Sequence, residues 1–374
     1  MKIGINTLFF IPGQVGGSET YLLEILRVWK KQALPHEFVL FSQLENDTLL
    51  RENFAGDGWD VPCCAFRAEN RFVRILREQI ELPRRVKKAG CDLLWSPGYT
   101  APFHVACPQA VSILDMQYKH HPEDLSFLAR WTTEALLQGC TRRRPHRILT
   151  ISEFSRQEIL RFTPARPEQI SVTPLAADPV FAPRTADTPD DQAPYLLCVA
   201  NTYPHKAVDR LVRAFGLISN EIPHQLWIIG RPRRGEAAFQ AALESCPDPH
   251  RVLRKSGLSR AELCQVYAGA ALFVFPSLYE GFGLPVLEAM QAGLPVLTTR
   301  QGSIPEVGGD AVAYVDPPDP ETLAEGILRR LKAPEAETAA FREKARLRAA
   351  TFTWEKTAEN TLALLEEHVR NRSS

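Results

Sequence analysis

Two glutamates flank a glycine-rich turn in the segment 276–297, PSLYEGFGLPVLEAMQAGLPVL. The apolar run ALFVFPS that leads into it predicts a buried strand, and Pro285 stands where a helix would begin, a position that proline favours. The free amides and the dipole at a helix N-terminus favour a bound anion, commonly a phosphate. Gly281 and Gly283 would let the backbone approach such a ligand closely.

Glu280 and Glu288 add hydrogen-bond acceptors to this turn. Glu280 lies at the mouth of the loop, and Glu288 lies about one turn into a helix that Gly293 would close. A carboxylate is a good acceptor for paired sugar hydroxyls. Phosphate on the amides and hydroxyls on the two acids together describe a nucleotide sugar. The same local pattern also fits an ordinary helix with acidic residues near its start.

The bulk composition excludes several classes of protein. A chain of 374 residues suggests two domains, and 44 basic against 44 acidic residues give no global charge for a nucleic-acid partner. No apolar run is long enough to span a membrane, and the N-terminal MKIGINTLFF predicts a first strand rather than a signal peptide. The eight cysteines lack metal-ligand spacing, so we expect buried free thiols, no metal site and a cytoplasmic protein.

Short apolar runs alternate with helical patterns along the chain, as in KIGINTLFF followed by GGSETYLLEILRVWKKQ. Such alternation predicts an α/β fold in which helices cover both faces of a mostly parallel sheet. The segment 177–194 is rich in Pro, Asp and Ala and lacks periodicity, which is typical of a linker. We therefore expect two doubly wound domains, 1–176 and 195–350. A terminal helix in 351–374 would pack back on the first domain.

The Glu-x7-Glu pattern in EGFGLPVLEAMQAGLPV resembles the signature of the retaining family 4 glycosyltransferases, also called glycosyl transferases group 1. Further segments agree in the expected order: GQVGGSETYLLEIL, ILTISEFSRQEI, ISVTPLAAD, VANTYPHKAVDRLVRAF and GSIPEVGGDAVAYVDPPD. The resemblance covers nearly the whole chain. It implies the GT-B fold, in which two Rossmann-like domains face each other across a cleft. The first domain would hold the acceptor and the second the nucleotide sugar.

The resemblance implies roles for the residues around the glycine turn. Glu288 would bind the nucleotide ribose, and Glu280 would lie beside the donor sugar and the reaction centre. The backbone amides of Phe282, Gly283 and Leu284 would meet sugar hydroxyls and phosphate.

A cation is expected beside the donor phosphates. Lys206 in NTYPHKAV matches the family's phosphate-binding lysine and would stabilise the leaving diphosphate as its charge develops. Family members often carry an arginine five residues earlier, where this chain has Asn201. Arg231, after the strand LWIIG, and His205 are candidates for the second cation. Selectivity for the base would come from the loop around Leu258.

The first domain would contribute backbone to the same ligand. Gly16 and Gly17 follow the first strand and precede a helix, so their amides would reach the diphosphate. The helix RFVRILREQIELPRRVKKAG, at 71–90, carries seven basic residues and an apolar stripe. This pattern fits either a membrane-surface helix, useful for lipid-linked acceptors, or a packed helix with a solvated basic face.

One departure from the family lies in AVSILDMQYKHHPEDL. Many members have His-Asp where this chain has Leu114 and Asp115, and leucine cannot donate a hydrogen bond. Three interpretations stay open: His120 or His121 replaces the histidine, the subgroup works without it, or activity is lost. Asp115 remains and would contact the donor sugar or the acceptor.

We therefore expect a retaining hexosyltransferase that needs neither a metal ion nor a cofactor. It would move a sugar from a nucleotide-diphosphate sugar to a hydroxyl of a saccharide or lipid-linked saccharide. YPHK and DMQYKHHPED resemble bacterial mannosyl- and rhamnosyltransferases of polysaccharide assembly, which favours a GDP-mannose-like donor. Two alternatives stay open: a nucleotide-sugar-binding protein with degraded activity, or an epimerase on the same fold. The protein would be cytoplasmic, with a peripheral position on the inner face of the membrane as a variant of this prediction.

Overall fold

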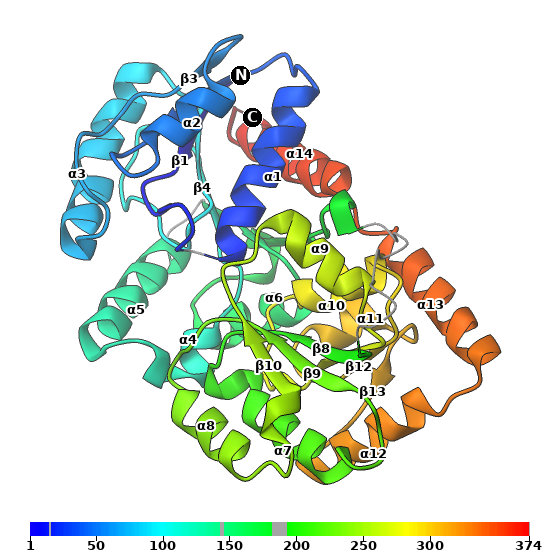
Figure 1. The fold of residues 1–374 in the computed structure, drawn as a ribbon. Helices are drawn as coiled ribbons and strands as arrows, with labels where there is room; N and C mark the ends of the chain where they lie inside the picture. Colours follow the sequence, from blue (N-terminus) through cyan, green and yellow to red (C-terminus); the bar gives the residue numbers. More distant parts are fainter. Residues whose placement is uncertain (15, 143–145, 182–192, 374) are drawn as a thin grey trace. The chain divides into compact units, whose positions relative to one another are not determined.

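The computed structural model of the chain describes residues 1–14, 16–142, 146–181 and 193–373. The chain divides into two compact units, each built on one parallel sheet (Figure 1). Unit 1 comprises Met1–Leu175 and Trp354–Ser374, and unit 2 comprises Ala176–Thr353. Most of the segment 177–194, which we expected to be a linker, lies outside the described residues.

Unit 1 contains a seven-stranded sheet with the order β3-β2-β1-β4-β5-β6-β7. All neighbouring strands run parallel. Its strands are β1 (Lys2–Asn6), β2 (Glu37–Phe41), β3 (Trp59–Asp60), β4 (Leu93–Ser96), β5 (Gln109–Ser112), β6 (His146–Thr150) and β7 (Ile170–Val172). The strands β4 and β5 are buried along their whole length, as expected for a parallel sheet that is covered on both faces.

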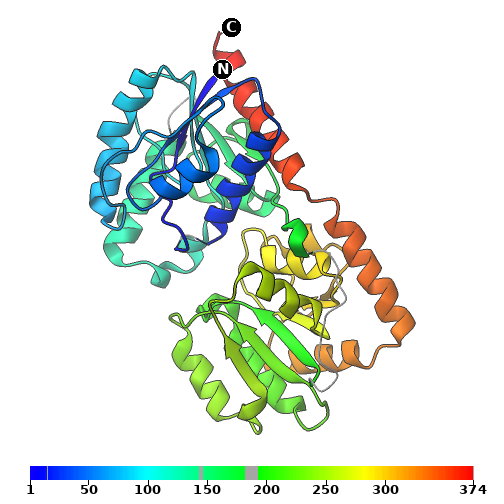
Figure 2. The same cartoon turned by 45° about the horizontal axis from the view of Figure 1, so that its top comes forward.

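Helices of unit 1 come mainly from the first half of the chain. They are α1 (Gly17–Lys31), α2 (Asp47–Phe54), α3 (Arg71–Ala89), α4 (Gln117–His120), η1 (Pro122–Asp124), α5 (Phe127–Arg142), α6 (Glu153–Phe162), η2 (Pro167–Gln169) and α14 (Trp354–Ser373). The terminal helix α14, red in Figure 2, runs beside α1 of the same unit. The indole Nε1 of Trp29 donates to the Ala358 carbonyl at 3.0 Å, which fixes α14 on the fully buried aromatic core around Trp29 and Trp95.

Unit 2 contains a six-stranded parallel sheet with the order β10-β9-β8-β11-β12-β13. Its strands are β8 (Tyr195–Val199), β9 (Gln225–Ile229), β10 (Val252–Lys255), β11 (Leu272–Phe275), β12 (Val296–Thr298) and β13 (Ala313–Tyr314). Its helices are η3 (Pro179–Phe181), η4 (Pro204–Lys206), α7 (Val208–Ile218), α8 (Glu236–Glu244), η5 (Pro249–Arg251), α9 (Arg260–Ala268), α10 (Leu284–Gln291), α11 (Ile304–Gly308), α12 (Pro320–Leu331) and α13 (Glu335–Ala349). Helices α7, α8 and α12 lie along one face of the sheet, and α9 and α10 along the other (Figure 1).

Both sheets reverse their strand order beside their first strand. In unit 1 the reversal lies between β1 and β4, and in unit 2 it lies between β8 and β11. The loops that leave the carboxyl ends of two such strands diverge to opposite faces, so a crevice opens where ligands of doubly wound folds bind. The predicted alternation of strands and helices is thus confirmed. In unit 2 the crevice is bordered by the loops that follow β8 and β11.

Candidate active site

The glycine turn between β11 and α10 has the predicted form. Gly283 is the N-cap of α10 with φ +96°, a left-handed conformation that favours glycine, and Pro285 lies in the first turn. Gly293, with φ +74°, follows the C-terminal end of the helix. The turn therefore requires glycine for backbone reasons of its own, apart from any ligand.

The start of α10 has backbone donors that pair with no backbone carbonyl. In the residues that the structure describes, the amides of Phe282, Gly283 and Leu284 donate to no backbone carbonyl. The ring of Phe282 is buried and packs edge-on against Phe352 at 5.9 Å, so only its backbone can serve a ligand. This arrangement is a helix N-terminus that can receive an anion.

Lys206 and Glu280 meet at the reversal of the sheet. The Lys206 ammonium lies 2.5 Å from Oε1 of Glu280, and Glu280 is buried. Their strands β8 and β11 are direct neighbours, and both residues follow the carboxyl ends of those strands. The ammonium also lies 5.6 Å from the ring centroid of Phe275. Two residues 74 positions apart therefore form one charged pair at the place where this fold binds ligands.

Two residues after β12 contact the backbone of Glu280, and the sequence patterns did not single them out as site residues. The amide and the hydroxyl of Ser303 each donate to the Glu280 carbonyl at 3.0 Å. Gly302 has φ +63°, and a Cβ at this position would lie 2.4 Å from the same carbonyl oxygen. The Gly-Ser pair just before α11 is the only local signal that could have indicated this role.

Glu288 has a different environment from Glu280. It is partly buried on α10, and burial raises the pKa of its carboxyl to about 7. The Tyr267 hydroxyl donates to Oε2 of Glu288 at 2.9 Å, and this bond, like the charge of Arg260, acts to lower that pKa. Tyr267 lies on α9 and is fully buried. An aromatic residue inside a helix carries no sequence signal for such a role, so it was not predicted.

Asn201 connects two loops of unit 2. Its side-chain oxygen accepts from the amide of Arg231 at 2.8 Å, which joins the ends of β8 and β9. The Arg231 side chain is exposed. The residue at the position of the family's usual arginine therefore has a structural contact of its own.

His205 and Leu258 are placed differently from each other. His205 is 1% exposed and its ring stacks on Tyr203 at 5.5 Å, while its carbonyl accepts from the amide of Leu278 at 2.7 Å. Its backbone thus ties the loop after β8 to the loop after β11. Leu258 is partly buried just before Ser259, the N-cap of α9, after Gly257 at φ +74°.

In unit 1 the glycine loop after β1 leaves open space. Gly16 is the N-cap of α1 with φ +57°, which favours glycine, whereas Gly17 is the first residue of the helix. A Cβ at Gly17 would meet no atom within 4 Å. The chain itself therefore gives no steric reason for glycine at this position.

Asp115 and Leu114 follow β5. Oδ1 of Asp115 accepts from the amide of Gln117 at 3.0 Å, and Leu114 is buried. His120 is hydrogen-bonded through Nε2 to Glu158, and Nδ1 of His121 lies 3.2 Å from Glu123. Both histidines thus have carboxylate partners within unit 1.

Other expected features concern the chain as a whole. No helix in the described residues is long and apolar enough to cross a membrane. Within the same residues, no three His, Cys, Asp or Glu side chains are grouped as metal ligands would be. All eight cysteines are free thiols, and only Cys63 and Cys107 are partly exposed.

Comparisons with known proteins agree with the motifs. Residues 184–348 match the family model described as Glycosyl transferases group 1, and residues 15–181 match the model described as Glycosyltransferase Family 4. Together the two matches cover most of the chain.

Two curated relatives are mannosyltransferases. The chain is 32% identical over 232 residues to O-antigen chain mannosyltransferase B of Escherichia coli, a match that spans 58% of this chain and 59% of that protein. It is 31% identical over 248 residues to the MMP alpha-(1->4)-mannosyltransferase of Mycolicibacterium hassiacum, which spans 64% of this chain and 58% of that protein. The chain thus matches less than two thirds of the length of either relative.

Solved structures share the whole fold. Sucrose-phosphate synthase from Thermosynechococcus elongatus superposes with a TM-score of 0.79 at 18% identity, covering 98% of both chains. Anabaena HepE in complex with UDP-glucose gives a TM-score of 0.73 at 17% identity, covering 100% of this chain and 99% of that one. At such low identity these likenesses show the fold alone. Family models and fold agree: the chain belongs to the family 4 glycosyltransferases, also called glycosyl transferases group 1, and its two Rossmann-like units are those of the GT-B fold.

Proposed function

We propose that the protein transfers a hexose from a nucleoside-diphosphate sugar to a hydroxyl of a saccharide acceptor in polysaccharide or glycolipid assembly. The observation that carries this proposal is the contact between Lys206 and Glu280 at the strand-order reversal of unit 2. The two mannosyltransferase relatives support the hexosyl class. HepE, which shares the fold, was solved with UDP-glucose, and this supports a nucleotide-sugar donor.

Each charged group would have a separate task in this reaction. Lys206 and the free amides at the start of α10 would stabilise the diphosphate as it leaves, because its negative charge grows in the transition state. Glu280 would keep Lys206 in place and lie beside the donor sugar. Glu288 would accept hydrogen bonds from the ribose hydroxyls.

Retention of configuration would follow from attack on the face that the diphosphate leaves. The bond from the anomeric carbon to the phosphate oxygen breaks, and a bond to the acceptor oxygen forms on the same face. The acceptor proton passes to an oxygen of the leaving phosphate, so no separate carboxylate base is needed. Asp115, which lies two residues before the short helix α4, would contact the donor sugar or the acceptor.

A GDP-mannose-like donor is the preferred substrate in this proposal. The mannosyltransferase relatives support the sugar, and the loop at Leu258 would contact the base. The experiment is calorimetric titration with GDP, UDP and ADP without added metal, on wild type and on Glu288→Ala. Losing this hydrogen-bonding carboxylate should weaken binding of the preferred nucleotide by about 1–3 kcal/mol, or about 5- to 150-fold in Kd.

The outcomes of that titration separate the open alternatives. Equal affinity in wild type and Glu288→Ala would contradict the ribose role. Nucleotide binding without transfer or hydrolysis of the sugar would favour a binding protein with degraded activity. Release of an epimerised nucleotide sugar instead of a glycoside would favour an epimerase.

We also propose that α3 carries a peripheral membrane contact. Phe72, Leu76 and Ile80 lie at four-residue spacing on this helix and are 57%, 58% and 47% exposed. They form an apolar stripe on a helix with seven basic residues, which suits an anionic lipid surface. Leu76→Glu should reduce co-sedimentation with phosphatidylglycerol vesicles several-fold. Leu347→Glu, on the equally exposed Leu347 of α13, should leave it unchanged; equal loss in both variants would contradict the contact.

A further inference from the structure

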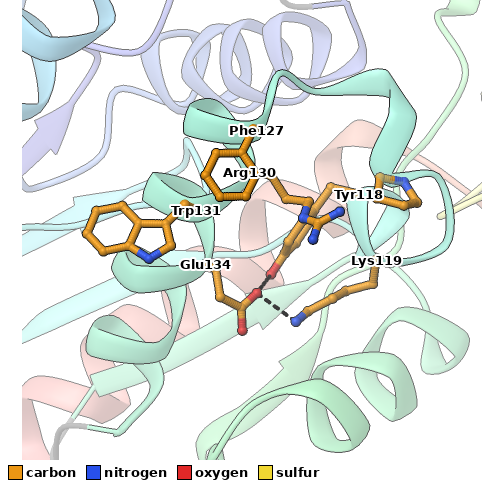
Figure 3. Close-up of a pocket in the computed structure, with 7 residues that line it drawn as sticks. Tyr118, Lys119, Phe127, Arg130, Trp131 and Glu134 are labelled. Atoms are coloured by element: carbon orange, nitrogen blue, oxygen red, sulfur yellow. Dashed lines mark hydrogen bonds and ion pairs between the residues drawn. The ribbon is translucent and has the colours of Figure 1, made fainter.

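A hollow of about 490 Å³ lies in unit 1 between the α4–η1 segment and helix α5 (Figure 3). Six side chains that line it are Tyr118, Lys119, Phe127, Arg130, Trp131 and Glu134. Its volume is within the range of about 300–1,000 Å³ that is typical of small-ligand sites. None of these residues belongs to the donor site described above.

Two aromatic rings on α5 form an exposed apolar wall. Phe127 and Trp131 lie one helical turn apart, and they are 81% and 63% exposed. Large aromatic side chains are usually buried, because removing their surface from water is favourable. An exposed pair that lines a hollow therefore offers a flat apolar face to a ligand.

The rest of the lining is polar, and hydrogen bonds hold it in place. The Glu134 carboxylate accepts from the Tyr118 hydroxyl at 2.7 Å and from Gln138 at 2.8 Å, and it lies 2.6 Å from the Lys119 ammonium. Burial acts to raise the pKa of Glu134, but the hydrogen bonds from Lys119 and Tyr118 outweigh it and hold that pKa below its ordinary value. Glu134 therefore stays ionised and held in position at neutral pH.

Arg130 supplies the remaining donors. Its side chain is exposed at the hollow (Figure 3), and it forms no ion pair with any residue in the described parts of the chain. The hollow thus combines flat aromatic faces, an ionised acceptor and a free guanidinium with several N–H donors.

This combination matches the chemistry of a sugar ring. A pyranose has an apolar face of C–H groups that can lie on an aromatic ring, and hydroxyls around its edge that both donate and accept. A fatty acyl chain would take the Arg130 guanidinium out of water and offer it no hydrogen-bond acceptor, which is costly. We infer that this hollow is a saccharide subsite for the acceptor, in which Trp131 and Phe127 stack on a sugar ring while Glu134 and Arg130 hydrogen-bond its hydroxyls.

This inference deepens the proposed function, because it assigns the bound saccharide to the acceptor side of the transfer. The first test is saturation-transfer NMR on the full chain without donor. The probes are mannobiose, maltose and chitobiose, on wild type, Trp131→Ala and Leu128→Ala. Leu128 is a matched control: it is 49% exposed on the same helix but does not line the hollow. Since Trp131 is mostly exposed, its replacement should leave the fold intact.

We expect at least one disaccharide to bind wild type and Leu128→Ala, and its signal to be lost in Trp131→Ala. Glu134→Gln keeps the size of the side chain but not its charge, so it should weaken the same probe. In transfer assays that use the bound probe as acceptor, Trp131→Ala should raise the acceptor KM about ten-fold, the order for a lost aromatic contact. It should leave kcat and the nucleotide Kd unchanged.

Several results would overturn the subsite. One is the absence of any Trp131-dependent saccharide signal, and another is an equal loss in Leu128→Ala. A third is that Trp131→Ala loses binding to phosphatidylglycerol vesicles but not to saccharide, which would make this face a lipid contact. The proposed function fails separately, if wild type neither binds nucleotides nor releases sugar from them. A Trp131-dependent disaccharide signal would then still support the saccharide subsite.

Discussion

The two sheets reverse their strand order at equivalent places, yet the residues at the two reversals behave differently. In unit 2 the neighbouring strands β8 and β11 lead to Lys206 and Glu280, a charged pair beside an open helix N-terminus. In unit 1 the neighbouring strands β1 and β4 end in Asn6 and Ser96. The Asn6 amide donates to Glu78 at 3.1 Å and to Ser96 at 3.3 Å, so these polar groups are buried and satisfy one another.

This difference shows that the fold supplies the location of a site while individual side chains decide its chemistry. Unit 2 brings a cation and two acids to its crevice, each fixed by the chain itself. Unit 1 instead leaves a glycine loop with open space around Gly17 and a separate hollow on α5. The charged pair supports the proposed donor site in unit 2, and the hollow supports the proposed acceptor subsite in unit 1.

The largest effect should come from breaking the charged pair. Lys206→Ala removes the cation that would stabilise the leaving diphosphate, so kcat should fall about 100- to 1,000-fold. The measurement is steady-state transfer with the nucleotide sugar that calorimetry identifies. Lys344→Ala breaks a pair of similar length, 2.7 Å to Asp310, on the surface of the same unit and should leave kcat unchanged. A normal kcat in Lys206→Ala would contradict the proposed role of the Lys206–Glu280 pair in the transfer reaction.

Two glycine substitutions test the difference between the two units: Gly302 of unit 2 contacts neighbouring backbone, whereas Gly17 of unit 1 borders open space. Gly302→Ala combines φ +63° with a close contact to the Glu280 carbonyl, so it should cost about 1–3 kcal/mol of unfolding free energy. Gly17→Ala meets no atom and lies in a helix, so it should change stability by less than about 1 kcal/mol. The resemblance to the family implies that the Gly17 amide meets the donor diphosphate, so on that prediction the added methyl group should raise the donor KM several-fold. Denaturant unfolding and donor kinetics on both variants measure this contrast, and unchanged donor KM in Gly17→Ala would contradict the role of the glycine loop.

The smallest effect should be a shift in pH dependence. Ionised Glu288 is the form that accepts ribose hydroxyls, and its pKa is raised to about 7, so nucleotide affinity should increase as the pH rises through 7. Tyr267→Phe removes a hydrogen bond that lowers this pKa, so the profile should move to higher pH. Calorimetry between pH 6 and 8 measures the shift; a flat wild-type profile would contradict it.

The same raised pKa has a consequence for stability. The unfolded carboxyl has its ordinary pKa near 4.5, so the native state holds this proton more strongly. The stabilisation is therefore complete below pH 4.5 and is lost as the pH rises to about 7. Glu288→Gln has no carboxyl to titrate, so its unfolding free energy should lack this pH dependence. Measuring both proteins separates the effect of pH on folding from its effect on nucleotide binding.

The sequence by itself determined the local architecture. Alternating apolar runs and helical patterns predicted two parallel-sheet units, and proline and glycine positions predicted the limits of α10. These signals are local, because strand burial, helix periodicity and capping depend on residues a few positions apart. The Glu-x7-Glu pattern also lies within one short segment, and its resemblance to the family's motif made Glu280 and Glu288 candidate site residues.

Only the tertiary structure decided which residues meet. Lys206 touches Glu280 because β8 and β11 are neighbours in the sheet. Ser303 bonds to the Glu280 carbonyl, and Gly302 lies against it, because β12 is next to β11. Tyr267 lies beside Glu288 because α9 and α10 share one face of the sheet. Such contacts depend on strand order and on the packing of crossover helices, which no local pattern of residues encodes.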